Sequence, residues 1–222
     1  MIYFSHKLAI GLLSLSSMLV LPLSAEAQTT QTFDIDGFTK LRAEAGVKVV
    51  FKRADTYLVK ADYVVDRDKT LHIKRRGKML LVKRKTKNGW KDARGRITVT
   101  INGPNLSYIE ASSGASIEAI NLDEVHLKIR TASGGSLKAT GECGSLNSKS
   151  VSGGTANLAD VLCNQVTARA YSGGRLKVNA SKQVKIRTDS GGAIRVYGSP
   201  ETRDIKSASG AYGGRTTFQD TP

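Results

Sequence analysis

Short runs of alternating apolar and polar residues fill the second half of the chain, and a glycine-containing step recurs between them. Leu127 and Ile129 precede one such step, and Leu137 and Ala139 follow it. Alternation with a period of two predicts strands with one buried face, here about three to five residues long. The step reads Ser-Gly-Gly or Ser-Gly-Ala. Its first glycines are Gly114, Gly134, Gly153, Gly173, Gly191 and Gly210, spaced by 20, 19, 20, 18 and 19 residues.

A single turn signal at a fixed place in each period favours stacked parallel coils over hairpins. In such coils each residue lies above its counterpart, and strands about 4.8 Å apart pair between coils. Glycine adopts positive φ at little steric cost, so the six glycines are expected to form one column of turns, with serine hydroxyls bonding between coils. The pattern predicts an all-β, single-stranded parallel β-helix or β-solenoid with coils of about 18–20 residues.

The mature chain is expected to be one domain, residues 28–222, with two parts of different regularity. Residues 105–214 carry the regular coils. Residues 28–104 also alternate but lack the repeated glycine step, which indicates irregular, basic early coils or a cap over the open end of the solenoid. The strands expected in this part are 47–51, 57–60, 70–75, 79–83 and 96–101.

Residues 1–27 have the pattern of a cleaved signal peptide. An apolar run from Leu8 to Leu23 is followed by small residues at Ala25 and Ala27. A membrane anchor is the weaker alternative, because the run is short and contains Pro22. The expected product is exported, periplasmic or secreted, and has no transmembrane segment after removal of the signal.

Positive charge is concentrated early in the chain. The formal net charge is +15, and residues 67–96 hold 13 Lys or Arg against two acids. The residues expected to form an anion-binding surface are Lys74, Arg75, Arg76, Lys78, Lys83, Arg84, Lys85 and Lys87. Such a surface attracts anionic glycans, lipopolysaccharide or other envelope polymers, without specific recognition of nucleic acid. The alternative is a solvated strand face that carries lysines as edge protection.

The two cysteines are expected to be stacked neighbours. Cys143 lies nine residues after Gly134, and Cys163 lies ten after Gly153. Adjacent strands are close enough for a disulfide, which an exported protein can form, while two buried free thiols are the alternative. The spacing of the cysteines and of His72 and His126 does not indicate a zinc site.

The sequence resembles the putative auto-transporter adhesin head GIN domain family. The resemblance rests on FDIDGFTKLRAEAGVKVVFKR, then TLHIKRRG, then ITVTINGPNLSYIEASSGASI followed by repeated Ser-Gly-Gly coils. It extends from about Phe33 to Tyr212. It implies a right-handed parallel β-helix-like fold, export and an adhesive role, with no catalytic residues to transfer.

The residues point to a binding protein rather than an enzyme. The serines of the glycine steps recur with the coil, which geometry explains, and no His or Asp recurs with them. Neither a cofactor nor a metal is expected. We therefore expect a non-enzymatic extracytoplasmic module for adhesion or for binding anionic polymers. The alternatives are a structural or envelope-stress protein without a specific ligand, and a β-helix enzyme that acts on polysaccharides.

Overall fold

In the computed structural model, the described part of the chain comprises residues 29–63, 70–85, 97–208 and 213–220. The predicted signal peptide lies outside these ranges, as do Lys87 and Gly210. Within the described ranges the secondary structure consists of strands, β1 to β15, and contains no helix, which confirms the prediction of an all-β chain.

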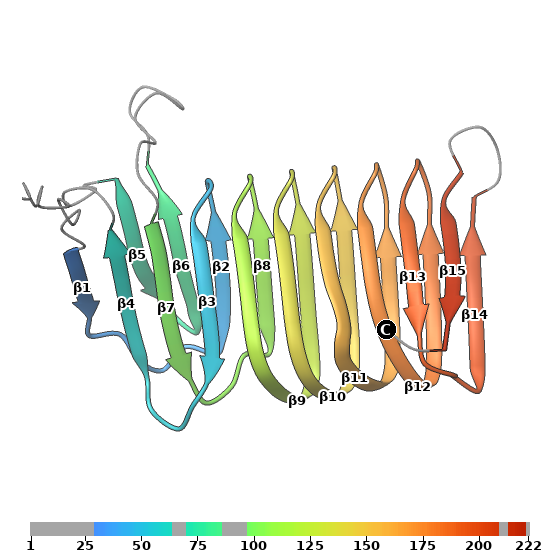
Figure 1. The fold of residues 1–222 in the computed structure, drawn as a ribbon, viewed down its shortest axis with the longest axis horizontal. Coiled ribbons are helices and arrows are strands. Elements are labelled where there is room, and N and C mark those ends of the chain that lie inside the picture. Colours follow the sequence, from blue (N-terminus) through green and yellow to red (C-terminus); the bar gives the residue numbers. More distant parts are fainter. Residues whose placement is uncertain (1–28, 64–69, 86–96, 209–212, 221–222) are drawn as a thin grey trace, which may run out of the picture.

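Four long strands form the regular part of the solenoid. They are β9 (Ser116–Ala132), β10 (Ser136–Val151), β11 (Thr155–Ala170) and β12 (Arg175–Thr188). Each pairs in parallel with the next. As Figure 1 shows, each strand runs down one side of a flattened coil, bends at the lower edge and rises on the other side. We call these sides the descending wall and the ascending wall. The predicted parallel β-solenoid is confirmed.

The expectation of strands of three to five residues is wrong for these coils. The long strands contain 14 to 17 residues, because the backbone keeps β pairing around the lower edge instead of breaking into a loop. Irregularities in register absorb the bend, for example between Ala139 and Gly141 of β10 against β9. These bulges also allow the coil length to vary by a residue or two without loss of the stack.

The Ser-Gly steps form the turns at the upper edge. Ser133 and Gly134 both have positive φ, 49° and 71°, as in a type I′ turn, and the N–H of Gly135 closes the turn by donating to the carbonyl of Ala132 over 2.9 Å. The N–H of Gly134 donates to the carbonyl of Ser152 in the next turn over 3.2 Å. The same geometry recurs at Gly114, Gly153, Gly173 and Gly191, with φ from 72° to 75°.

The two glycines of a step have different roles. A Cβ on Gly134 would meet no atom within 4 Å, so this position needs glycine for its φ. A Cβ on Gly135 would lie 2.2 Å from the carbonyl oxygen of Ala111 in the preceding coil, so this position needs glycine for space. The intercoil bonds of the turns described above run through the backbone. Hydroxyls bond between coils just before the turn, where Thr131 donates to Ser150 over 2.9 Å.

The first coil in the stack is out of chain order. It consists of β2 (Lys40–Glu44) and β3 (Lys48–Arg53), joined by a turn in which Ala45 and Gly46 have φ of 58° and 71°. β2 lies between β6 (Met79–Arg84) and β8 (Tyr108–Ser112), and β3 lies between β7 (Ile97–Gly103) and β9. This coil is therefore inserted between two segments that follow it in sequence.

Antiparallel strands close the amino-terminal end. β5 (Leu71–Arg76) pairs with β6, β4 (Leu58–Tyr63) pairs with β7, and β1 (Thr29–Phe33) pairs with β4, all antiparallel. The five strands expected from the sequence in this region correspond to β3 through β7, with bounds that differ by one to three residues except at Met79, where the expected and observed starts coincide. The less regular amino-terminal portion is thus made of one inserted coil and an antiparallel cap.

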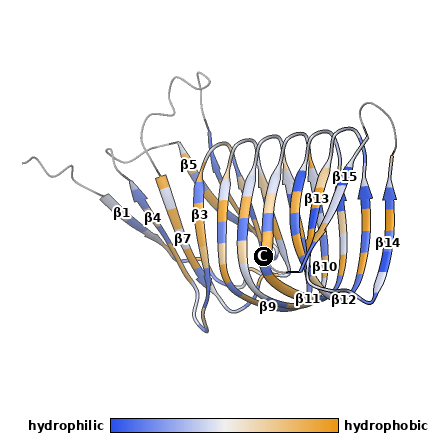
Figure 2. Ribbon diagram, turned by 45° about the vertical axis from the view of Figure 1, so that its right-hand side comes forward, coloured by the Kyte–Doolittle hydropathy of each residue, from blue (hydrophilic) through white to orange (hydrophobic). Residues whose placement is uncertain are grey.

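The core is a narrow layer between the walls, and the strands show alternating apolar and polar bands in Figure 2. One interior column contains Leu127, Leu146, Val166 and Val184, each no more than 2% exposed and each in register with the next. At the other end of the stack, β12 continues the solenoid into three shorter strands. They are β13 (Ala193–Tyr197), β14 (Thr202–Ser207) and β15 (Arg215–Gln219).

Candidate anion-binding surface

The β5–β6 hairpin carries most of the predicted basic residues, and its register decides which way they face. Ile73 is opposite Val82, and both are buried, so this pair defines the inward face. Lys74 is opposite Leu81, and Lys83 is opposite His72. Side chains alternate along a strand, so Lys74, Lys83 and His72 share the outward face of the ascending wall.

Only some of the other members of the predicted set lie on that outward face. Arg76 joins it opposite Met79, but Arg75 and Arg84 fall on the inward-facing positions, opposite Leu80 and Leu71. Arg84 is partly buried, and Nη1 of Arg75 donates to the carbonyl of Gly77 over 3.2 Å. Lys78 and Lys85 are exposed at the ends of β6, and Lys87 is outside the described residues. The outward cluster therefore consists of Lys74, Arg76, Lys83 and the flanking Lys85.

The pKa of His72 responds to its burial and to the charge of this cluster. Partial burial lowers the pKa of the imidazole below its ordinary value, and the positive charges of Lys85, Lys74 and Lys83 lower it further. Each neighbouring cation disfavours a further positive charge on the ring. The three lysines make the local potential positive, and a positive potential attracts an anion.

The neighbouring strand extends the positive surface beyond the region that the sequence singled out. Lys40 of β2 is in register with Met79, and Arg42 is in register with Leu81. The sequence signal was present, because Lys40 and Arg42 alternate with the buried Leu41, but only the insertion of β2 beside β6 brings them to the hairpin. A shallow hollow of about 280 Å³ opens here, lined by Lys40, Arg42, Met79, Ser107, Tyr108 and Lys128.

A buried acid limits this surface on its other side. Glu110 of β8 is 8% exposed and accepts a hydrogen bond from the hydroxyl of Tyr108 over 2.7 Å. Nη2 of Arg42 lies 2.7 Å from Oε2 of Glu110, and Nε of Arg130 lies 3.3 Å from Oε1. The two arginines are therefore held by one carboxylate, so they are less available to an external anion than Lys40 or Lys74.

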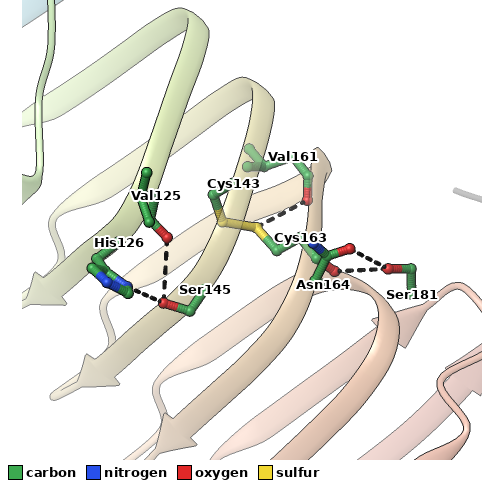
Figure 3. The surroundings of a disulfide bond; sticks show 8 residues. All are labelled: Val125, His126, Cys143, Ser145, Val161, Cys163, Asn164 and Ser181. Carbon is green, nitrogen blue, oxygen red and sulfur yellow. Dashed lines mark hydrogen bonds between the residues drawn. A yellow bond between two sulfur atoms is a disulfide. The ribbon is translucent and has the colours of Figure 1, made fainter.

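The cysteines lie near the middle of β10 and β11, and Figure 3 shows the bond between them. Cys143 and Cys163 are register partners, their Cα atoms are 4.6 Å apart, and their sulfur atoms are bonded at 2.01 Å. Nearby, Nδ1 of His126 and Oγ of Ser145 are 2.8 Å apart. Oγ of Ser145 also donates to the carbonyl of Val125 over 3.5 Å. Among the described residues no acid is hydrogen-bonded to the imidazole of His126, as a triad would require.

Metal ligands and membrane helices were also sought in the part of the chain that the structure describes. There, no group of three or more His, Cys, Asp or Glu side chains could hold a metal ion. The same residues form no helix with the length and apolar character needed to cross a membrane.

Comparison with known proteins places the fold. The chain is similar to a putative adhesin from Bacteroides fragilis NCTC 9343, with 13% sequence identity and a TM-score of 0.67 over 88% of this chain and 98% of that chain. It is also similar to a putative lipid binding protein from Parabacteroides distasonis ATCC 8503, with 12% identity and a TM-score of 0.53 over 86% of this chain and 97% of that chain. No curated protein matches the sequence. At these identities the likeness shows a shared fold.

The family is shown by the sequence itself. Residues 37–200 match the family model described as putative auto-transporter adhesin, head GIN domain. The match runs from just before the inserted coil to just past the end of β13, and it confirms the resemblance seen in the glycine-marked coils. The chain is a member of the auto-transporter adhesin head GIN domain family.

Proposed function

We propose that the protein is an exported, non-enzymatic binding module for anionic polymers of the cell envelope or its surroundings. The observation that carries the proposal is the outward cluster of Lys74, Arg76, Lys83 and Lys85 beside Lys40. Long-range attraction to this cluster concentrates polyanions at the surface and orients their approach.

The charge balance of the cluster supports an external partner. Among the described residues, the acid in register with the cluster is Glu44, opposite Lys83, and its carboxylate lies 3.9 Å from Nη1 of Arg42. One carboxylate shared in this way cannot neutralise the cations around it. Adjacent like charges on paired strands repel, and a bound polyanion would remove that repulsion.

The relatives support binding in a general sense. One solved relative is named a putative adhesin and another a putative lipid binding protein, so both names describe attachment rather than chemistry. The apolar run and small residues within residues 1–27 support export. Anionic glycans and lipopolysaccharide are the polymers that an exported basic surface would meet.

The test is retention on immobilised heparin, with lipopolysaccharide-coated beads as a second probe. The test variant replaces Lys74, Arg76, Lys83 and Lys85 with Gln. Arg84 is left intact because it lies at an inward-facing position of the hairpin. A matched control removes the same charge from exposed positions of the descending wall, through Lys48→Gln, Lys52→Gln, Lys138→Gln and Lys177→Gln.

We expect the test variant to elute at a lower salt concentration than the control variant, because the surface charges are screened over about 8 Å at physiological ionic strength. Elution of the test variant with the wild type would show that the cluster is only a solvated strand face. Equal loss in both variants would show a response to net charge without a site.

A further inference from the structure

A second row of cations runs along the ascending wall, away from the hairpin. One outward position of each coil is basic, and parallel pairing puts these positions in direct register from β9 through β14. We call this row the basic ladder: Arg130, Lys149, Arg169, Arg187 and Lys206. Its members are 18 to 20 residues apart in the sequence, so they do not form a locally basic segment, and only the stacking of the coils brings them together.

Burial of the flanking residues fixes the outward direction of the ladder. Ala168 and Ala170, on either side of Arg169, are completely buried. Ile186 and Thr188, on either side of Arg187, are at most 2% exposed. Arg130, Lys149, Arg169 and Arg187 are partly exposed, and Lys206 is exposed. The charged groups therefore stand in a line on the outer surface.

Four of the five ladder residues lack the ion pairs that neutralise charge elsewhere on the same wall, while the fifth, Arg130, is paired with Glu110. Glu110 stands between Arg42 and Arg130, and Nζ of Lys185 lies 3.5 Å from Asp204. By contrast, no ion pair within the described residues involves Lys149, Arg169, Arg187 or Lys206. Neighbouring strands are about 4.8 Å apart, and like charges at that separation destabilise a sheet.

The contacts of the ladder side chains hold them beside shallow hollows. Nη1 of Arg169 donates to Oδ1 of Asn147 over 3.2 Å, and Nζ of Lys149 lies 5.6 Å from the ring centre of Tyr171. Two hollows flank the row. One, of about 320 Å³, is lined by Tyr171, Arg187, Thr188, Asp189, Lys206, Ser207 and Ala208. The other, of about 300 Å³, is lined by His126, Leu127, Lys128, Ser145, Leu146, Asn147, Gln165 and Thr167.

We propose that the basic ladder is the track on which a linear anionic polysaccharide lies, parallel to the long axis of the solenoid. This inference rests on the proposed function. It adds a second binding site for the anionic polymer and the direction in which the polymer lies on the protein. From Arg130 to Lys206 the ladder covers four strand spacings, or about 19 Å. Evenly spaced cations in a straight line match a polymer that repeats its carboxylate or sulfate groups, whereas a single anionic headgroup would contact only one or two of them.

The same row is poorly suited to single-stranded nucleic acid. Proteins that bind such strands without sequence preference stack the bases on exposed aromatic rings. Along the described part of the ladder, the nearby aromatic rings are those of Tyr171 and of Tyr108, and a lysine already lies over each of them, Lys149 and Lys128. Sugars with charged substituents need the cations but not a series of stacking rings.

The experiment measures heparin binding by calorimetry at several salt concentrations, with a ladder variant and a control variant. The ladder variant is Lys149→Gln, Arg169→Gln and Arg187→Gln. The control variant removes the same charge from exposed descending-wall positions, through Lys138→Gln, Lys177→Gln and Arg195→Gln. A second ladder variant carries Arg169→Glu alone. It places an acid between the register neighbours Lys149 and Arg187, as Glu110 stands between Arg42 and Arg130.

We expect the ladder variant to bind heparin at least tenfold more weakly than the control variant at low salt. The dependence of affinity on salt should also become less steep, because fewer counterions are exchanged when cations are removed. Both ladder variants should unfold at or above the wild-type temperature, since like-charge repulsion is relieved. That result separates loss of binding from loss of folding.

Polymer length gives an independent readout. Size-fractionated heparin oligosaccharides should bind the wild type more tightly as they lengthen, until they span the ladder, and this gain should vanish in the ladder variant. Equal affinity of the ladder and control variants, with the wild type still binding, overturns the ladder and leaves the proposed function standing. Absence of wild-type binding at low salt overturns both. Equal binding of single-stranded DNA of matched charge overturns the choice of polysaccharide.

Discussion

The two glycines of each turn offer the sharpest test of the fold, because they are adjacent in sequence but constrained by different physics. Gly134→Ala places a Cβ in open space at a φ of 71°. Its cost is that of the left-handed backbone for a residue with a side chain, about 1–2 kcal/mol. The free energy of unfolding should fall by that amount and the neighbouring coils should not move.

Gly135→Ala meets a different obstacle. Its Cβ would lie 2.2 Å from the carbonyl oxygen of Ala111, whereas ordinary contact begins at 3.4 Å, so the coils must separate locally. Two intercoil bonds span this place, from Gly114 to Ser133 at 3.2 Å and from Ser136 to Ala115 at 2.9 Å. Losing both costs about 2 kcal/mol in addition to the overpacking, which by itself costs about 1–3 kcal/mol.

The assay is urea denaturation of both variants, followed by far-ultraviolet circular dichroism at 25 °C. We expect Gly135→Ala to lose about 3–5 kcal/mol, more than Gly134→Ala. Gly154→Ala should show a smaller excess over Gly153→Ala, since its nearest atom, in Thr131, is 2.7 Å away. Equal losses at Gly134 and Gly135, or a milder effect at Gly135, would refute the assignment of φ to one glycine and space to the other.

Three further predictions follow from particular contacts. Reduction of the Cys143–Cys163 bond, with its sequence separation of 20, should lower the free energy of unfolding by about 3 kcal/mol, and an unchanged urea midpoint in reductant would contradict this. Burial and neighbouring lysines lower the pKa of His72, so the protein should lose stability as pH falls from about 6.5, the ordinary pKa of histidine, towards the pKa of the folded state. Titration by nuclear magnetic resonance should give a His72 pKa below about 6.5 that rises when heparin is added, and a pKa of about 6.5 or higher in the free protein would count against the cluster. Glu110→Gln leaves Arg42 and Arg130 without the carboxylate between them and should lower the free energy of unfolding by about 1.5 kcal/mol, the low end for a charged hydrogen bond because both arginines are partly exposed. A melting temperature equal to that of the wild type would show that the carboxylate is dispensable.

The sequence by itself determined the regular coils. Turn geometry depends on the φ preference of one or two residues, and strand faces depend on alternation within a few residues, so both can be read locally. The spacing of Gly134 and Gly153 therefore set the register well enough to bring Cys143 beside Cys163, where the structure has them. Alternation likewise located β3 through β7 within a few residues of their observed bounds.

Only the tertiary structure decided which separate segments pair. The insertion of β2 between β6 and β8 depends on contacts between residues far apart in sequence, and no local pattern encodes that order. The direction of Arg84 depends on the same pairing, because a side chain faces the core or the solvent according to its partner strand. The basic ladder arises because parallel stacking places residues one coil apart within a single strand spacing, which turns dispersed charges such as Lys149 and Arg169 into one continuous line.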